Sequence, residues 1–112
     1  MNKSLIVLAC LLSSYSAFAF DYDCSNEKST TDILACLNDG YARADKVLNL
    51  VWKNLEKNEE LVANQREWIK RRDERCEEAA QKGNGSVAKM LRLDCLIDQT
   101  LEQTLGLASL LK

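Results

Sequence analysis

The chain between residues 29 and 55 carries apolar residues on one face of a predicted helix. Steps of three and four residues separate them, which is the spacing of a stripe along an α-helix. The stripe consists of Leu34, Leu37, Tyr41, Ala44, Leu48, Val51 and Leu55. The polar residues 29–32 precede it, and each is of a type that caps a helix N-terminus. The pattern therefore predicts a first helix that begins at these caps and ends near residue 55.

Two further helices are predicted after the first. Asn58 marks a break, and the two glutamates after it suit the first turn of a helix that runs to about residue 81. The stripe of this second helix consists of Leu61, Gln65, Trp68, Ile69, Arg72, Cys76 and Ala80. Residues 82–86 form the clearest turn in the chain and offer Ser86 as the next N-cap. The third helix, residues 87–110, has a wide apolar face. That face consists of Met90, Leu91, Leu93, Cys95, Ile97, Leu101, Leu105 and Ala108.

The fold class that follows is all-α, a small bundle of three antiparallel helices in which the first two could be nearly continuous. The chain has no proline and only four glycines among its 112 residues. Alanine, leucine, glutamate, lysine and arginine are abundant, and these residues favour helices joined by few turns. No alternation of β-branched residues competes with this interpretation.

The first nineteen residues have the pattern of a secretory signal peptide. Lys3 precedes the apolar run 5–12, and residues 17–19 form a small-x-small cleavage site. The run is too short for a stable membrane anchor. Cys10 is loosely placed for lipoprotein attachment, an alternative that we disfavour because the apolar run before it is unusually short. Cleavage after Ala19 removes 19 of the 112 residues, and the remaining 93 form one domain. We expect this domain in the periplasm, with secretion from the cell as the alternative.

Cleavage would also reduce the five cysteines to four, namely Cys24, Cys36, Cys76 and Cys95. An even number in a small exported chain indicates two disulfides. Three connectivities are possible, and sequence alone does not choose among them. Geometry favours local pairing, because a chain that folds back at residues 82–86 brings Cys76 level with Cys95. A Cys24–Cys36 bridge would pin the N-terminal segment onto the first helix.

The sequence lacks residue types and motifs on which catalysis and metal binding commonly depend. The chain has no histidine, which removes the commonest general base and a frequent metal ligand. No Cys-x-x-Cys motif is present for a metal or for thiol redox chemistry. Loss of Lys3 with the signal would change the formal net charge from −2 to −3, which is too mild to indicate nucleic acid or an anionic membrane as partner. We therefore expect no cofactor, no metal and no catalytic residues.

Residues 65–76 hold the densest cluster of charge. Trp68 and Arg72 share a helix face, as do Arg72 and Cys76. A cationic, aromatic binding surface is one hypothesis. We favour the structural alternative, in which the tryptophan is a core anchor and most arginines are solvated beside neighbouring glutamates. Arg72 and Asp73 are expected to differ from the rest, being partly buried and bonded to each other or to the backbone.

The most specific run of the chain is Gln-Arg-x-Trp-Ile-x-x-Arg-Asp-x-x-Cys at residues 65–76. Together with the export signal, the cysteine spacing and the glycine turn, it resembles the lysozyme inhibitor LprI-like N-terminal domain family of small exported bacterial proteins. The matching positions are Gln65, Arg66, Trp68, Ile69, Arg72, Asp73, Cys76, Gly83, Gly85 and Thr100. The resemblance implies a helical, disulfide-linked fold and inhibition of lysozyme. The chain departs from the family at Gln103, where an arginine is common.

The resemblance makes an exported binding protein that inhibits a lysozyme-like cell-wall hydrolase the first functional hypothesis. An immunity protein against a secreted toxin and an envelope protein with a structural or assembly role are the alternatives. Candidate partner contacts are Asn84 in the predicted turn, or an acidic face near the N-terminus with Asp21 and Asp23. We expect a monomer or weak dimer that binds another protein and has no stable membrane anchor.

Overall fold

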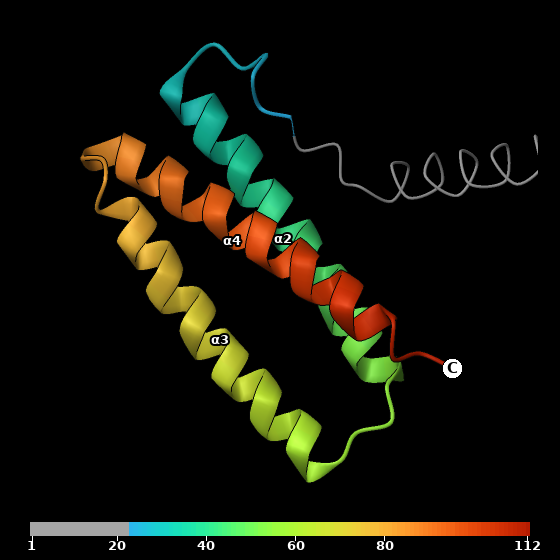
Figure 1. Ribbon diagram of the computed structural model, residues 1–112. Helices are drawn as coiled ribbons and strands as arrows, with labels where there is room; N and C mark the ends of the chain where they lie inside the picture. The colour runs from blue at the N-terminus through green and yellow to red at the C-terminus, as the bar shows by residue number, and fades with distance from the viewer. Residues whose placement is uncertain (1–22) are drawn as a thin grey trace, which may run out of the picture.

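The computed structural model describes residues 23–112, which form three helices and no strand. Helix α2 spans Thr30–Asn54, α3 spans Glu59–Ala80 and α4 spans Gly85–Ala108. Figure 1 shows that α2 and α4 run in the same direction and that α3, which connects them along the chain, runs in the opposite direction. This arrangement confirms the all-α class and the three predicted helices.

The ends of the helices are set by polar side chains. The Ser29 side chain accepts a hydrogen bond from the Asp32 amide, and Asn58 Oδ1 accepts one from the Leu61 amide at 2.8 Å. These bonds satisfy amide groups that have no partner inside the helix. At α4 the N-cap is Asn84, without a capping side-chain bond. The prediction of Ser86 at that position is wrong, because the helix begins one residue before it.

Helix α4 packs against both other helices. The core cluster consists of Leu48, Leu55 and Leu107, with Val51, Trp52, Leu61 and Trp68 packed against it. Leu55 has an extended backbone at the end of α2, so α2 and α3 are separate helices rather than one nearly continuous helix. Leu55 is also buried and belongs to the core cluster, so the segment between α2 and α3 contributes a side chain to the core.

Two positions of the predicted apolar stripes face solvent. Ile69 is 40% exposed and Leu105 is 48% exposed. On α4 the buried line instead runs through Ile97, Thr100, Thr104 and Leu107. A hydropathy pattern does not reveal this buried line, because threonine counts as a polar residue. The Thr104 hydroxyl donates to the Thr100 carbonyl at 2.7 Å, so its burial leaves no unsatisfied donor.

Both disulfides have the predicted pairing. Cys24 and Cys36 are bonded with Cα atoms 5.8 Å apart, and Cys76 and Cys95 are bonded with Cα atoms 5.4 Å apart. The first disulfide ties the N-terminal segment to α2, and the second joins α3 to α4. Local pairing, which geometry favoured among the three connectivities, is therefore confirmed.

The predicted signal peptide over residues 1–19, its cleavage after Ala19 and the candidate contact Asp21 lie outside the described residues. Among the helices that are described, none has the length and apolar character needed to cross a membrane.

Candidate protein-binding site

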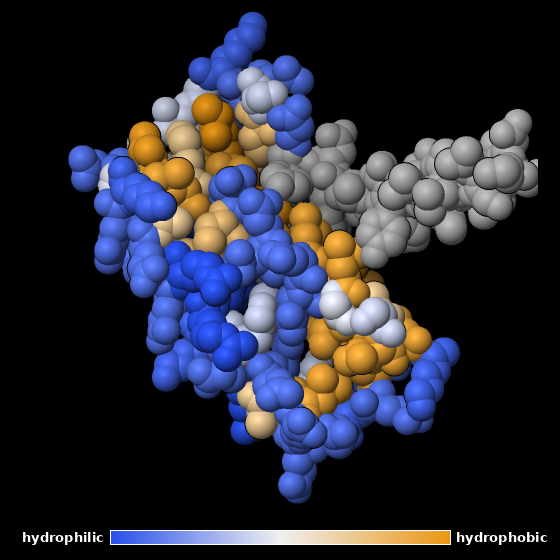
Figure 2. Space-filling view, in the orientation of Figure 1, coloured by the Kyte–Doolittle hydropathy of each residue, from blue (hydrophilic) through white to orange (hydrophobic). Residues whose placement is uncertain are grey.

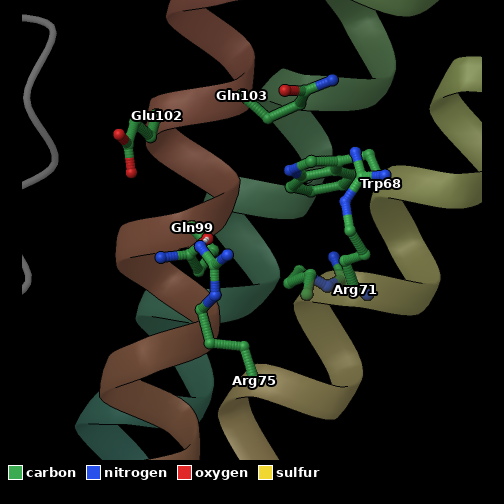
Figure 3. A pocket seen from close by; sticks show the side chains of 7 residues that line it. Trp68, Arg71, Arg75, Gln99, Glu102 and Gln103 are labelled. Atoms are coloured by element: carbon green, nitrogen blue, oxygen red, sulfur yellow. Dashed lines mark hydrogen bonds between the residues drawn. The ribbon is translucent and has the colours of Figure 1, made fainter.

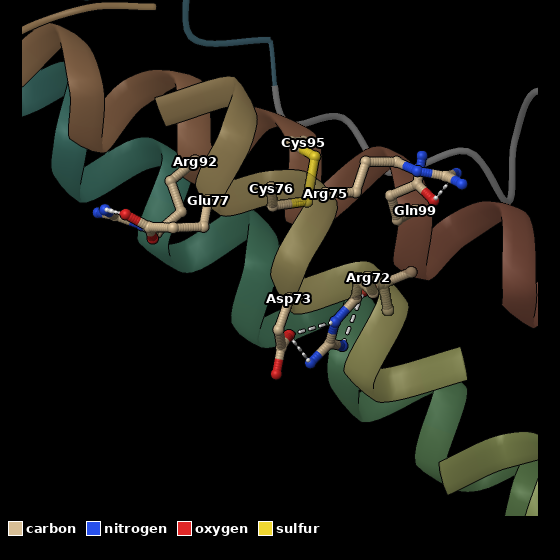
Figure 4. Close-up of a disulfide and its surroundings, with 9 residues drawn as sticks. Arg72, Asp73, Arg75, Cys76, Glu77, Arg92, Cys95 and Gln99 are labelled. Carbon is tan, nitrogen blue, oxygen red and sulfur yellow. Dashed lines mark hydrogen bonds and ion pairs between the residues drawn. A yellow bond between two sulfur atoms is a disulfide. The ribbon is translucent and has the colours of Figure 1, made fainter. Parts of the chain in front are cut away.

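Arg72 of α3 is the centre of a polar network that links two helices. Its Nε and Nη2 groups donate to Asp73 Oδ1 at 3.0 and 2.9 Å, and its Nη1 group donates to Thr100 Oγ1 of α4 at 3.4 Å (Figure 4). The Arg72 side chain is only 10% exposed, whereas that of Asp73 is 58% exposed. The predicted Arg72–Asp73 bond is confirmed, and the expected partial burial applies to the arginine alone.

Two aromatic rings flank the Arg72 guanidinium. Its Cζ atom lies 5.1 Å from the Trp68 ring centroid and 5.8 Å from that of Tyr41 on α2. Both distances fit cation–π contacts. Burial raises the pKa of Tyr41, and the positive charge of Arg72 opposes that rise. Arg72 therefore contacts groups from all three helices and fixes their relative positions.

A second buried bond joins α3 to α4. Gln103 Nε2 donates to Oε1 of the buried Gln65 at 2.8 Å. Position 103 is the place where the resembling family commonly has an arginine. In this chain the side chain at that position is neutral, and its amide bonds the Gln65 amide of α3, so the polar contact between the helices carries no charge.

An open groove lies between α3 and α4 beside this network. It has a volume of about 370 Å³. Its lining residues are Trp68, Arg71, Arg72, Arg75, Gln99, Glu102 and Gln103. Figure 2 shows strongly hydrophilic side chains gathered over this face of the molecule. In Figure 3 Arg71 extends alongside Trp68, Arg75 reaches toward Gln99, and Glu102 points away from the gap between the helices.

The turn between α3 and α4 stands at the end of a cross-linked helical hairpin. The Cys76–Cys95 disulfide and a two-bond ion pair between Arg92 and Glu77, at 3.0 and 3.1 Å, hold the two helices behind it (Figure 4). Gly85 has a φ of +55°, a conformation that favours glycine. Asn84, which lies between Gly83 and Gly85, is exposed. The turn thus presents an amide side chain from a constrained backbone.

Gly83 is required at the turn for a different reason, which is close packing. A Cβ atom at this position would lie 2.7 Å from Cγ1 of Val87 and 3.1 Å from Cδ1 of Leu91. The turn therefore packs directly against the first two turns of α4. The structure thus explains why glycine is needed at position 83, through close packing, and at position 85, through a positive φ.

Residues 23–29, which precede α2, lie at the same end of the molecule as this turn (Figure 1). Hydrogen bonds from the Ser25 side chain and amide lower the pKa of Asp23. Asp23 and Asp94 border an apolar hollow of about 430 Å³ between the starts of α2 and α4. The apolar side chains that line it are Ile33, Leu37, Val87, Met90 and Leu91. This end combines an apolar surface with acidic groups at its edge.

Asp94 supplies a testable pH effect. Its apolar surroundings raise its pKa, and the negative charge of Asp98 raises it further. The folded state therefore holds this proton more tightly than the unfolded state, and stability falls as the pH rises through the raised pKa. We expect Asp94→Asn to raise the melting temperature at pH 7 and to lose that advantage at pH 3. Thermal unfolding at both pH values tests this. Glu74→Gln, at an exposed position of α3, is the control, and an equal gain from both substitutions would contradict the assignment.

The structure gathers five of the ten family-motif positions at the contact between α3 and α4. Gln65, Trp68, Arg72, Cys76 and Thr100 meet there. Arg66 and Ile69 of the same run are exposed. Sequence reasoning missed the groove, in which the exposed arginines of α3 face α4. The available signal was the four-residue spacing of Arg71 and Arg75, which places both on one helix face.

The described residues thus form a small disulfide-linked helical protein with open polar surfaces and a constrained turn. Among residues 23–112 no group of acidic or cysteine side chains is placed to hold a metal ion. A model of the lysozyme inhibitor LprI family matches residues 23–107. The chain therefore belongs to the lysozyme inhibitor LprI family. No curated protein and no solved structure shows a significant match.

Membership has three direct consequences. The family is one of inhibitors rather than catalysts, which suggests that the chain is not an enzyme. A family named for lysozyme inhibition implies a protein partner such as lysozyme. Together with the two disulfides, it also indicates a protein that acts outside the cytoplasm.

Proposed function

We propose that this protein is exported to the periplasm, where residues 20–112 bind a lysozyme-like cell-wall hydrolase and inhibit it. The observation that carries the proposal is the family match over residues 23–107. The two disulfides support it, because they suit an oxidising compartment and stiffen a small domain. A stiff binder loses less conformational entropy on association than a flexible one.

The proposed partner contacts lie at the end of the molecule that holds the turn of residues 82–86 and the N-terminal segment. Asn84 is exposed there on the constrained turn, and Asp23 lies at the edge of the apolar hollow. Asp21 belongs to the same proposed surface by its place in the sequence. An apolar centre with a polar rim is the usual anatomy of a protein interface. Acidic groups at this rim suit a basic hydrolase and would mainly raise the association rate.

A lysis assay tests the proposal. Oxidised protein covering residues 20–112 is titrated into a lysozyme acting on bacterial cell walls, at low and at physiological salt. We expect dose-dependent loss of lytic activity that weakens as salt rises, because exposed charges are screened. Lysozymes of more than one type are needed, since a family name does not select among them.

Substitutions locate the contact within the same assay. We expect Asn84→Ala and Asp23→Asn each to weaken inhibition, and Asp23→Asn also to reduce its salt dependence. Asn64→Ala on α3 and Glu56→Gln in the connection between α2 and α3 make the same chemical changes at exposed positions toward the opposite end of the molecule and should leave inhibition unchanged. Failure to inhibit any lysozyme would refute the proposed function. Capture of a toxin or an envelope protein would then support the alternative roles.

A further inference from the structure

The groove between α3 and α4 has an unusual balance of charge. Arg71 and Arg75 lie four residues apart on α3 and both line it. Across the groove α4 presents the amides of Gln99 and Gln103. Glu102, the one carboxylate in the lining, points away from the gap in Figure 3. The buried Arg72 also lines the groove, but its charge is paired with Asp73 at 2.9 Å. Two exposed guanidinium groups therefore face the amide side chains of α4 across the groove.

Three other arginines of the described residues, one of them Arg72 of the groove lining, form close ion pairs. Arg43 meets Asp39 at 2.9 Å, Arg72 meets Asp73 at 2.9 Å, and Arg92 meets Glu77 at 3.0 Å. The contacts of Arg71 and Arg75 are longer, and that of Arg75 is to a neutral group. Arg75 Nη1 donates to the neutral Gln99 Oε1 at 3.3 Å, and the contact from Arg71 to Glu67 is 3.9 Å long. The guanidinium groups of Arg71 and Arg75 thus keep donors for an incoming anion.

We propose that this groove binds the carboxylate of a small acidic amino sugar. Guanidinium groups recognise carboxylates through paired, charge-assisted hydrogen bonds. Gln99 and Gln103 can exchange hydrogen bonds with hydroxyl and acetamide groups, and the Trp68 ring offers an apolar surface beside them. The groove volume of about 370 Å³ lies at the lower end of ligand pockets, which suits a ligand of one or two sugar rings. The choice of this sugar rests on the proposed export, because cell-wall saccharides of this chemistry surround an exported protein. It does not depend on inhibition of lysozyme.

The test compares two sugars that differ only in the carboxylate-bearing arm. Residues 20–112, labelled with ¹⁵N, are titrated with N-acetylmuramic acid and separately with N-acetylglucosamine while amide, indole and glutamine side-chain resonances are followed. We expect N-acetylmuramic acid to shift the Trp68 indole and Gln99 amide resonances with a dissociation constant on the order of 1 mM, and N-acetylglucosamine to bind at least about tenfold more weakly. Acetate and inorganic phosphate, added alone, separate recognition of the sugar acid from simple anion binding.

Substitutions assign the binding to the groove. The double change Arg71→Gln and Arg75→Gln should weaken N-acetylmuramic acid at least about tenfold. The change should not unfold the domain, because both side chains are exposed. Arg66→Gln removes the same charge from an exposed position of α3 that lines a different hollow, and it should bind the sugar acid as the parent protein does. Melting temperatures verify that all three proteins are folded.

Several results would overturn the inference. Equal affinity for the two sugars would show that the groove does not recognise the carboxylate. Binding of acetate or phosphate as tight as that of N-acetylmuramic acid would show that it does not recognise the sugar. Unchanged binding of N-acetylmuramic acid by the double variant would show that the sugar acid binds outside this groove. Loss of lysozyme inhibition in the double variant, with no sugar binding by the parent, would assign the groove to a protein partner instead.

Discussion

Arg72→Ala is expected to destabilise the domain by about 2–4 kcal/mol and to lower its melting temperature by roughly 10 °C or more. The substitution removes the hydrogen bonds to Asp73 and Thr100 and the cation–π contact with Trp68. It also leaves a cavity where a 10% exposed side chain joined three helices. Such a loss is a large share of the ~5–15 kcal/mol that holds a typical domain folded. Chemical denaturation with tryptophan fluorescence measures it directly.

Two variants serve as controls for this prediction. Arg71→Ala removes the neighbouring arginine, which is 57% exposed, and should change stability by no more than about 0.5 kcal/mol. Arg72→Lys keeps the charge but loses the planar fork, so it should recover only part of the stability. Equal effects of Arg71→Ala and Arg72→Ala would show that Arg72 does not link the helices.

Removal of the Cys76–Cys95 disulfide by a double change to alanine is expected to cost about 3 kcal/mol. The bond closes a loop between residues 19 positions apart and joins α3 to α4 within the buried contact. Its loss restores freedom to the unfolded chain and loosens the hairpin that carries the exposed turn. We therefore expect weaker lysozyme inhibition as well as a lower melting temperature.

The second disulfide provides the matched comparison. Cys24 and Cys36 are 12 positions apart and join the N-terminal segment to α2. Their removal should cost slightly less, because the closed loop is shorter, and should leave the α3–α4 contact in place. If the Cys24–Cys36 double variant were the less stable of the two, the N-terminal segment would contribute more to the fold than its contacts indicate.

Local signals in the sequence predicted much of the fold. Ser29 and Asn58 cap their helices by side-chain bonds that reach only three residues ahead, and such short-range chemistry is visible in the sequence. The turn at residues 82–86 favoured the Cys76–Cys95 pair, although sequence alone left three connectivities open. Ser86 was misplaced as a cap because three adjacent residues, Asn84, Gly85 and Ser86, all suit that position.

The candidate site was harder to predict because it depends on how α3 and α4 align. Gln65 and Gln103 are 38 residues apart, and Arg72 and Thr100 are 28 apart. A periodic pattern gives the face of each helix but not the residue opposite on its neighbour. The amide side chains of Gln99 and Gln103, which face the exposed arginines across the groove, are recognised only once the two helices are placed together.

The central claim is that this protein binds a lysozyme-like hydrolase and blocks its catalysis. The most direct measurement is the initial rate of hydrolysis of a small soluble oligosaccharide by lysozyme as oxidised protein of residues 20–112 is added, because a soluble substrate rules out simple coating of the cell wall. The account predicts a rate that falls to near zero at a fixed molar ratio and falls less when the same amount of Asn84→Ala protein is added instead. An unchanged rate at large excess of folded protein, for lysozymes of several types, would contradict it.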